Sequence, residues 1–149
     1  MSRRLFLVAV LALAAAGAAG ATIVVQRSIA GVSIALSQAK VRAILGKPSK
    51  VVRGRNAFGR YVEYRYRGLV LDFQGGNPLS SISTIRRTER TRRGIGVGST
   101  RRAVRRRVRG ARCGRTLCTV GQLLPGRIVT TFYLRRGIVR RVSIARVLD

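Results

Sequence analysis

The chain of 149 residues contains no histidine, two cysteines and four acidic residues. Without histidine, a Ser–His or Cys–His nucleophile pair is excluded, and so is the commonest general base near neutral pH. Two cysteines and four scattered acids supply neither a four-ligand zinc set nor a calcium-binding loop. We therefore expect a non-enzymatic protein with no catalytic residue, no metal, no cofactor and no small-molecule substrate.

The four acids are Glu63, Asp72, Glu89 and Asp149. Glu63 and Asp72 can face each other across a hairpin, which is the arrangement that an enzyme with paired carboxylates would need. Arginines surround both residues in the sequence, and nearby positive charge lowers the pKa of a carboxyl group. The sequence therefore favours a salt-bridge role for these two acids, and an enzyme would require a cleft around them.

Against the four acids stand 31 lysines and arginines, which give a formal net charge of +27. Only Lys40, Lys47 and Lys50 are lysines. Codon bias toward arginine is one explanation of this preference, and selection for binding is the other. A net charge of this size attracts polyanions whichever explanation holds.

Thirteen arginines lie in residues 86–115, where a predicted helix places several of them on its solvent side. Guanidinium groups pair bidentately with phosphate and carboxylate. The alternative to a binding role is that these arginines only form the solvated face of a helix. The predicted polyanion-binding residues are Arg101, Arg102, Arg105, Arg106 and Arg109.

The expected partner is an anionic envelope polymer, a lipid surface or an acidic protein. Residues 86–115 contain no aromatic side chain on which bases could stack, and this argues against nucleic acid.

The N-terminal segment has the pattern of a secretory signal peptide. Arg3 and Arg4 precede the apolar residues 5–19, and Ala19-Gly20-Ala21 is a small-residue cleavage site. The alternative is an uncleaved anchor to about residue 25, because residues 5–25 contain 21 residues without a charge. Both interpretations place the rest of the chain outside the cytoplasm, either secreted or membrane-anchored.

Cys113 and Cys118 enclose four residues, and a disulfide between them would close a hairpin tip. A cysteine pair in an exported chain is more often bridged than free. Closing so short a loop should stabilise the fold by only about 2 kcal/mol. A redox or metal role is the alternative, but the spacing is not CxxC.

Part of the chain occurs twice, because residues 31–45 align without gaps on residues 94–108, 63 positions later. The matched positions are Gly31, Val32, Ile34, Ser37, Val41 and Leu45 with Gly94, Ile95, Val97, Thr100, Val104 and Val108. An internal repeat sets the architecture. We expect an α+β fold of two tandem helix-plus-antiparallel-sheet modules, at 28–87 and 94–149, joined by the linker 88–93.

Each copy contains a short predicted helix. Ser37 can cap a helix over residues 38–45, with Val41, Ile44 and Leu45 as its apolar stripe. Thr100 can cap the second helix, with Val104 and Val108 as the stripe.

Hairpins follow both helices. Alternating polar and apolar residues predict strands at 61–67 and 69–73, with a third at 81–85, and at 128–134 and 138–145.

The glycine-rich residues 94–98 precede the second helix and invite comparison with a phosphate-binding loop. No P-loop lysine and serine follow, so a tight turn is the favoured interpretation.

Residues 36–48 (LSQAKVRAILGKP) resemble the G-M-[ST]-x-x-x-V-x-x-x-L-G-x-P signature of the small-protein-A/OmlA (BamE) family. Two such modules in tandem are similar to the architecture of the secreted β-lactamase inhibitory proteins. The resemblance implies an extracytoplasmic scaffold that binds another protein through its sheet face or loops. The alternative function is thus an inhibitor or envelope assembly factor whose sheet presents Tyr61, Tyr64, Tyr66, Phe132 and Tyr133.

Overall fold

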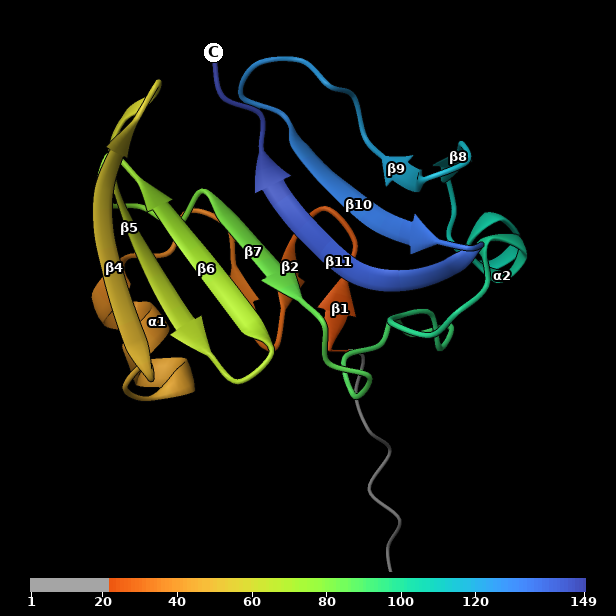
Figure 1. The fold of residues 1–149 in the computed structure, drawn as a ribbon, viewed down its shortest axis with the longest axis horizontal. Helices are drawn as coiled ribbons and strands as arrows, with labels where there is room; N and C mark the ends of the chain where they lie inside the picture. Colours follow the sequence, from red (N-terminus) through yellow and green to blue (C-terminus); the bar gives the residue numbers. More distant parts are fainter. Residues whose placement is uncertain (1–21) are drawn as a thin grey trace, which may run out of the picture.

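The computed structural model describes residues 22–149, and the predicted signal segment 1–21 lies outside the described residues. Two antiparallel sheets of three and eight strands dominate the structure (Figure 1). Strand accounts for 45% and helix for 12% of the described residues 22–149. The predicted α+β class with two tandem helix-plus-sheet modules is therefore wrong, because the protein is mostly β with two short helices.

The large sheet has the strand order β4-β5-β6-β7-β11-β10-β9-β8. Its strands are β4 (Lys50–Asn56), β5 (Gly59–Tyr66), β6 (Leu69–Gln74), β7 (Ser81–Thr84), β8 (Arg112–Cys113), β9 (Leu117–Val120), β10 (Ile128–Arg135) and β11 (Ile138–Arg146). The small sheet consists of β1 (Ile23–Val24), β2 (Ser28–Ile29) and β3 (Val32–Ser33). The helices are α1 (Gln38–Leu45) and α2 (Arg101–Arg107).

The two halves of the chain share the large sheet because β7 pairs with β11. Ile82 lies opposite Ile144, and Thr84 lies opposite Val142. Strands β4 to β7 come from the first half, and β8 to β11 come from the second. Pairing between strands this far apart in the sequence leaves no local signal, so the prediction of two tandem modules did not include one sheet shared by both halves.

The helix caps were predicted correctly. The Ser37 hydroxyl accepts a hydrogen bond from the Lys40 amide at 3.3 Å, and the Thr100 hydroxyl accepts one from the Ala103 amide at 3.1 Å. Val41 is the buried residue of α1. Ile44 was expected in the same stripe, but its side chain is 49% exposed and lies near Gly31.

The predicted hairpins are confirmed as β5–β6 and β10–β11, and the predicted third strand as β7. Strand β4, an edge strand with a glycine at its centre, was not predicted. Gly54 allows the Tyr61 ring of β5 to lie directly against the β4 backbone.

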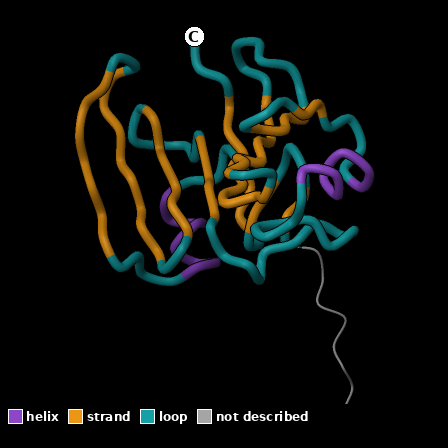
Figure 2. The backbone as a smooth tube through the Cα atoms, turned by 45° about the vertical axis from the view of Figure 1, so that its right-hand side comes forward, coloured by secondary structure: helices purple, strands orange, loops and turns teal. Residues whose placement is uncertain are grey.

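The core lies on one face of the large sheet. Along this face Leu71 is opposite Ile82, and Ile82 is opposite Ile144. Both helices and the small sheet pack against the same face (Figure 2), since their buried side chains belong to a single cluster. Among the described residues, this cluster extends from Ile23 to Ile144.

The first described residues tie the two halves together. Ile23 is 1% exposed, and the Thr22 and Ile23 amides donate to the Arg90 carbonyl at 3.0 and 2.9 Å. The Gln26 amide donates to the Thr130 hydroxyl of β10 at 2.7 Å. The N-terminal residues 22–33, which form the small sheet, thus contact the second half of the chain, although they come before the strands of the first half in the sequence.

Cys113 and Cys118 form the predicted disulfide, with an S–S distance of 2.03 Å and a Cα–Cα distance of 4.0 Å. They are paired residues of the β8–β9 hairpin. The disulfide indicates an oxidising, extracytoplasmic setting. Across residues 22–149, neither helix has the length and apolar character that a membrane span requires.

We predict that Cys113→Ala/Cys118→Ala lowers the free energy of unfolding by about 2 kcal/mol, because the bridge closes only a short loop. Denaturant titration with and without a thiol reductant measures this. The reductant should destabilise the wild type to the level of the variant and leave the variant unchanged. A wild type that is insensitive to reductant would contradict the prediction.

Candidate polyanion-binding surface

Helix α2 presents its arginines to solvent because its apolar residues hold it to the sheet. Val104 is fully buried, and Val108, which ends the helix, is 6% exposed. The five predicted arginines are all exposed, as is Arg107, which the sequence analysis left out. Arg109 was predicted on the helix face, but it lies beyond the end of α2.

The arginines of α2 have no acidic partner in the described structure. The two salt bridges within residues 22–149 join Arg65 to Glu63 and Arg86 to Glu89, both outside α2. Arg101 makes one long hydrogen bond, to the Gly114 carbonyl at 3.5 Å. Like charges three and four residues apart repel each other on a helix. Because no acidic side chain of the described structure pairs with these arginines, their repulsion is not offset within residues 22–149.

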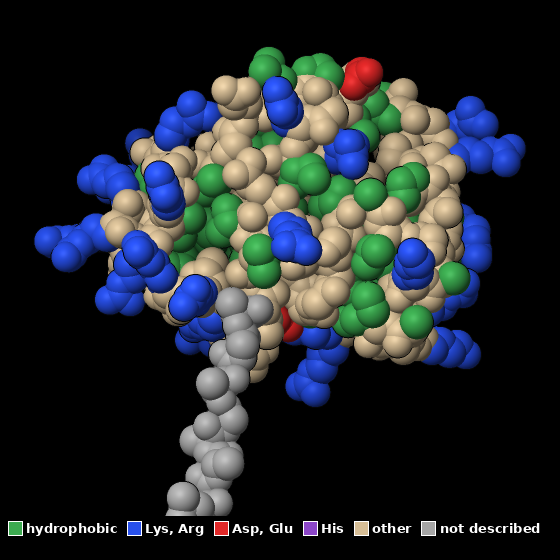
Figure 3. All heavy atoms as spheres, turned by 180° about the vertical axis from the view of Figure 1, so that it is seen from behind, with side chains coloured by type: hydrophobic (Ala, Val, Ile, Leu, Met, Phe, Trp, Pro, Cys, Tyr) green, Lys and Arg blue, Asp and Glu red, His purple; other side chains and the backbone are tan. Residues whose placement is uncertain are grey.

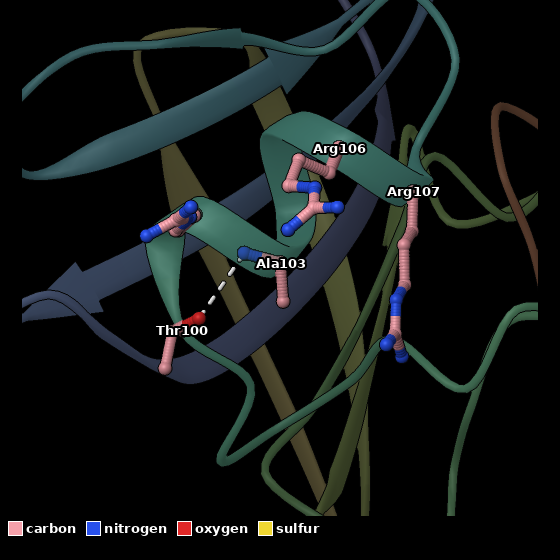
Figure 4. Close-up of a pocket in the computed structure, with 5 residues that line it drawn as sticks. Thr100, Ala103, Arg106 and Arg107 are labelled. Atoms are coloured by element: carbon pink, nitrogen blue, oxygen red, sulfur yellow. Dashed lines mark hydrogen bonds between the residues drawn. The ribbon is translucent and has the colours of Figure 1, made fainter.

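A hollow of about 310 Å³ lies beside α2, lined by Thr100, Arg102, Ala103, Arg106 and Arg107. Figure 4 shows the Thr100 cap bonded to the Ala103 amide, with Arg106 and Arg107 extending from the next turn. The structure therefore gathers two of the five predicted arginines around one hollow and adds Arg107.

The tip of the β10–β11 hairpin lies beside the start of α2. The Arg101 amide donates to the Gly137 carbonyl at 2.8 Å, and Thr100 forms a bridge with Ile138. The hairpin adds four exposed arginines that were not among the predicted binding residues. These are Arg135, Arg136, Arg140 and Arg141. Two Arg-Arg pairs on either side of a predicted turn could have indicated them.

Near the hairpin tip is a second hollow of about 690 Å³, which the four hairpin arginines line with Ile85, Tyr133 and Leu134. The Arg141 guanidinium lies 4.0 Å from the centre of the Tyr133 ring, which is a cation–π contact. We call the arginines of α2, Arg109 and the hairpin arginines together the basic end. Seen from behind, Lys and Arg side chains project from the outline of the molecule and also lie across this face, among apolar side chains (Figure 3).

The aromatic residues proposed for a protein-binding sheet face divide between the two faces. Tyr64 and Phe132 are buried in the core and are not available to a partner. The Tyr66 hydroxyl donates to the Gly46 carbonyl at 2.9 Å, beyond the end of α1. Tyr61 and Tyr133 remain on the open face, where each is partly exposed.

Glu63 and Asp72 face each other across β5 and β6, as the sequence suggested. Glu63 pairs with Arg65, and the Ser81 hydroxyl donates to Asp72 Oδ2 at 2.8 Å. Burial raises the pKa of Asp72; the hydrogen bond from Ser81 opposes this rise, and the charge of Glu63 adds to it. The expectation that arginines lower the pKa of Asp72 was therefore wrong, because burial outweighs the attraction of Arg65.

These two acids line an open hollow of about 490 Å³ together with Phe58, Tyr61 and Leu148. Phe58 is 55% exposed. Arg146 also lines this hollow, so this part of the open sheet face combines apolar and acidic side chains with one arginine.

The glycine-rich loop before α2 is a structural turn. Gly94 and Gly98 have φ values of 75° and 94°. The Gly96 amide donates to the Ser99 hydroxyl at 3.1 Å, and the Gly98 amide donates to the Val139 carbonyl at 2.8 Å. Because these amides are already bonded within the protein, they are not free to hold a phosphate.

The Arg90 side chain forms hydrogen bonds to several groups of this loop. Its guanidinium donates to the carbonyls of Arg87, Gly94 and Val97 at 2.9 to 3.1 Å, and to the Ser99 hydroxyl at 3.3 Å. Arg90 is therefore a structural arginine, in contrast to the free guanidinium groups of α2.

Comparison with protein-family models, curated proteins and solved structures gives no match. Charge and geometry therefore carry the functional assignment. At the basic end, the charge and the geometry of the exposed arginines both indicate a polyanion as the ligand.

We predict that Arg90→Ala lowers the free energy of unfolding by about 3 kcal/mol, because several carbonyls lose a charged donor in a partly buried loop. Denaturant titration measures the change. The matched control Arg93→Ala, at an exposed arginine of the same loop, should change stability by less than about 0.5 kcal/mol. Equal effects of the two substitutions would contradict the structural role of Arg90.

We predict that Asp72→Asn raises the free energy of unfolding at pH 7. The folded-state pKa of Asp72 lies above the value of 3.8 for a free carboxyl group, so the folded protein favours the protonated form. The stability due to that proton is complete below 3.8 and is lost as the pH rises through the folded-state pKa.

The gain from Asp72→Asn should therefore shrink as the pH falls toward 3, which denaturant titrations across this pH range measure. Asp149→Asn, at the exposed C-terminal residue, is the control. A gain for Asp72→Asn that does not change with pH would show that the carboxyl group does not titrate as proposed.

Proposed function

We propose that the protein is an exported, non-enzymatic binding protein that engages an anionic envelope component or an acidic protein through its basic end. The observation that carries this proposal is the set of exposed arginines on α2, whose first residue, Arg101, is bonded to Gly137 at the tip of the arginine-bearing β10–β11 hairpin. None of the α2 arginines has a carboxylate partner within residues 22–149.

The energetics of α2 favour an external anion. Arg101 and Arg105 are one turn apart, as are Arg102 and Arg106, and each such pair weakens an isolated helix by a few tenths of a kcal/mol. Packing of Val104 and Val108 holds the helix in place despite this repulsion. A phosphate or carboxylate between neighbouring guanidinium groups would remove the repulsion and form charge-assisted hydrogen bonds.

The compartment is consistent with this proposal. The disulfide indicates an oxidising setting, where phosphate-bearing wall polymers, anionic lipid headgroups and acidic protein surfaces are the available polyanions. Export through the segment 1–21, cleaved or retained as an anchor, remains part of the proposal.

The test is replacement of five arginines by glutamine, at Arg101, Arg102, Arg105, Arg106 and Arg109. Five exposed charge pairs of about 0.5 kcal/mol each correspond to a roughly 70-fold loss of affinity. Inorganic polyphosphate, polyglutamate and anionic vesicles are the probes, with affinity measured across a range of salt concentrations. The variant should also show a weaker dependence on salt, because fewer counterions are released.

A matched control variant changes the net charge equally at the other end of the molecule. It replaces the exposed residues Lys40, Lys47, Lys50, Arg53 and Arg55 by glutamine. If the overall charge alone attracts polyanions, the two variants lose the same affinity, and the proposed site is wrong. Circular dichroism melts establish that both variants fold.

The second candidate is a protein inhibitor or envelope assembly factor that binds through the open sheet face. It is favoured by the hollow in which the exposed Phe58 ring lies with Tyr61, Glu63 and Asp72. A protein partner captured from an envelope extract by this face would survive a wash at about 1 M salt, where screening acts over roughly 3 Å. A polyanion held at the basic end would be released early in the same wash.

A further inference from the structure

A third hollow, of about 370 Å³, lies where β1 meets the segment that follows α2. Its floor is apolar and includes Val24 and Val108. The polar part of its lining consists mainly of exposed arginines, which come from two separate segments of the chain. These are Arg92, Arg93, Arg107 and Arg109.

The fold builds this hollow from three parts of the chain. Ile23 of β1 points into the core and is 1% exposed, so the next side chain, Val24, points outward and is 41% exposed. The bonds from the Thr22 and Ile23 amides to the Arg90 carbonyl hold β1 against the segment that carries Arg92 and Arg93. An exposed valine is thereby fixed among arginines.

The lining of this hollow is more apolar than that of the hollow near the hairpin tip. A phosphate polymer has charge but no apolar part, and it would leave the floor around Val24 exposed to water. A phospholipid has an anionic phosphate directly attached to apolar chains. It can therefore pair with guanidinium groups and cover an apolar floor at the same time.

We propose that this hollow docks on a membrane by holding one anionic phospholipid, with its phosphate between Arg92, Arg93, Arg107 and Arg109 and the start of its acyl chains over Val24. This deepens and rests on the proposed function, because it names a lipid surface as one anionic component that the protein binds. The apolar residues 5–19 precede Thr22 in the sequence. A chain that retains them in a bilayer holds this hollow next to the lipid.

Tryptophan fluorescence tests the contact with lipid directly, since the chain contains no tryptophan. Val24→Trp places a single reporter on the floor of the hollow, and Ile44→Trp places one on α1, at a side chain that is similarly exposed. Both variants are made in residues 22–149, the part of the chain that follows the predicted signal segment, and circular dichroism melts establish that both fold. With vesicles of phosphatidylglycerol and phosphatidylcholine, the emission of Val24→Trp should shift to the blue, and that of Ile44→Trp should not.

Affinity measurements separate this proposal from the general attraction of polyanions. Arg92→Gln/Arg93→Gln should bind these vesicles roughly 25-fold more weakly, at about fivefold for each arginine. Arg53→Gln/Arg55→Gln is the control of equal charge. Val24→Asn should weaken vesicle binding roughly fivefold through the loss of apolar contact, and it should leave polyphosphate binding unchanged.

Three results would overturn the docking proposal: no fluorescence shift for Val24→Trp, equal losses in the two arginine variants, or full vesicle affinity of Val24→Asn. In each of these cases, polyphosphate binding that is still lost on replacing the α2 arginines would leave the proposed function intact. A different outcome is also informative: Val24→Asn loses vesicle binding, and the wild type does not bind polyphosphate. This outcome would support the lipid site and contradict the wider polyanion function.

Discussion

Strands β7 and β11 pair through only four residues each, yet this pairing makes one sheet of two half-sheets. It places Ile82 beside Ile144 in the middle of a continuous apolar face, on which α1, α2 and the small sheet all pack. Each half of about 60 residues would otherwise have a core close to the lower limit for independent folding. The bonds from Thr22 and Gln26 to the second half reinforce the same joint from the other side.

A chain with a net charge of +27 gains little from ion pairing. The described structure contains two salt bridges, and both are short-range pairs in the sequence, Arg65 with Glu63 and Arg86 with Glu89. Burial of apolar side chains must therefore offset the mutual repulsion of the arginines. Arg90 is instructive because its guanidinium is satisfied by carbonyl groups, which accept hydrogen bonds without a counter-charge.

The distribution of charge gives the protein surfaces of different character. Glu63 and Asp72 lie with Phe58 on the open sheet face, whereas the basic end has arginines without acidic partners in the described chain. The hollow at Val24 is of a third kind, because its arginines surround a lining that is more apolar than that of the hollow near the hairpin tip. These differences explain why salt, charge substitution and apolar substitution can distinguish the possible partners.

Features that depend on neighbouring residues were predictable from the sequence. The caps at Ser37 and Thr100, the hairpins and the Cys113–Cys118 disulfide were all predicted, since each is determined by contacts over a few residues. The exposure of the α2 arginines also follows from the spacing of Val104 and Val108. The tertiary structure decided what depends on distant pairing: the single sheet, the small sheet of two-residue strands, and the hairpin arginines beside α2. It also decided the pKa of Asp72, because the burial that raises this pKa depends on how the residues around Asp72 pack in three dimensions.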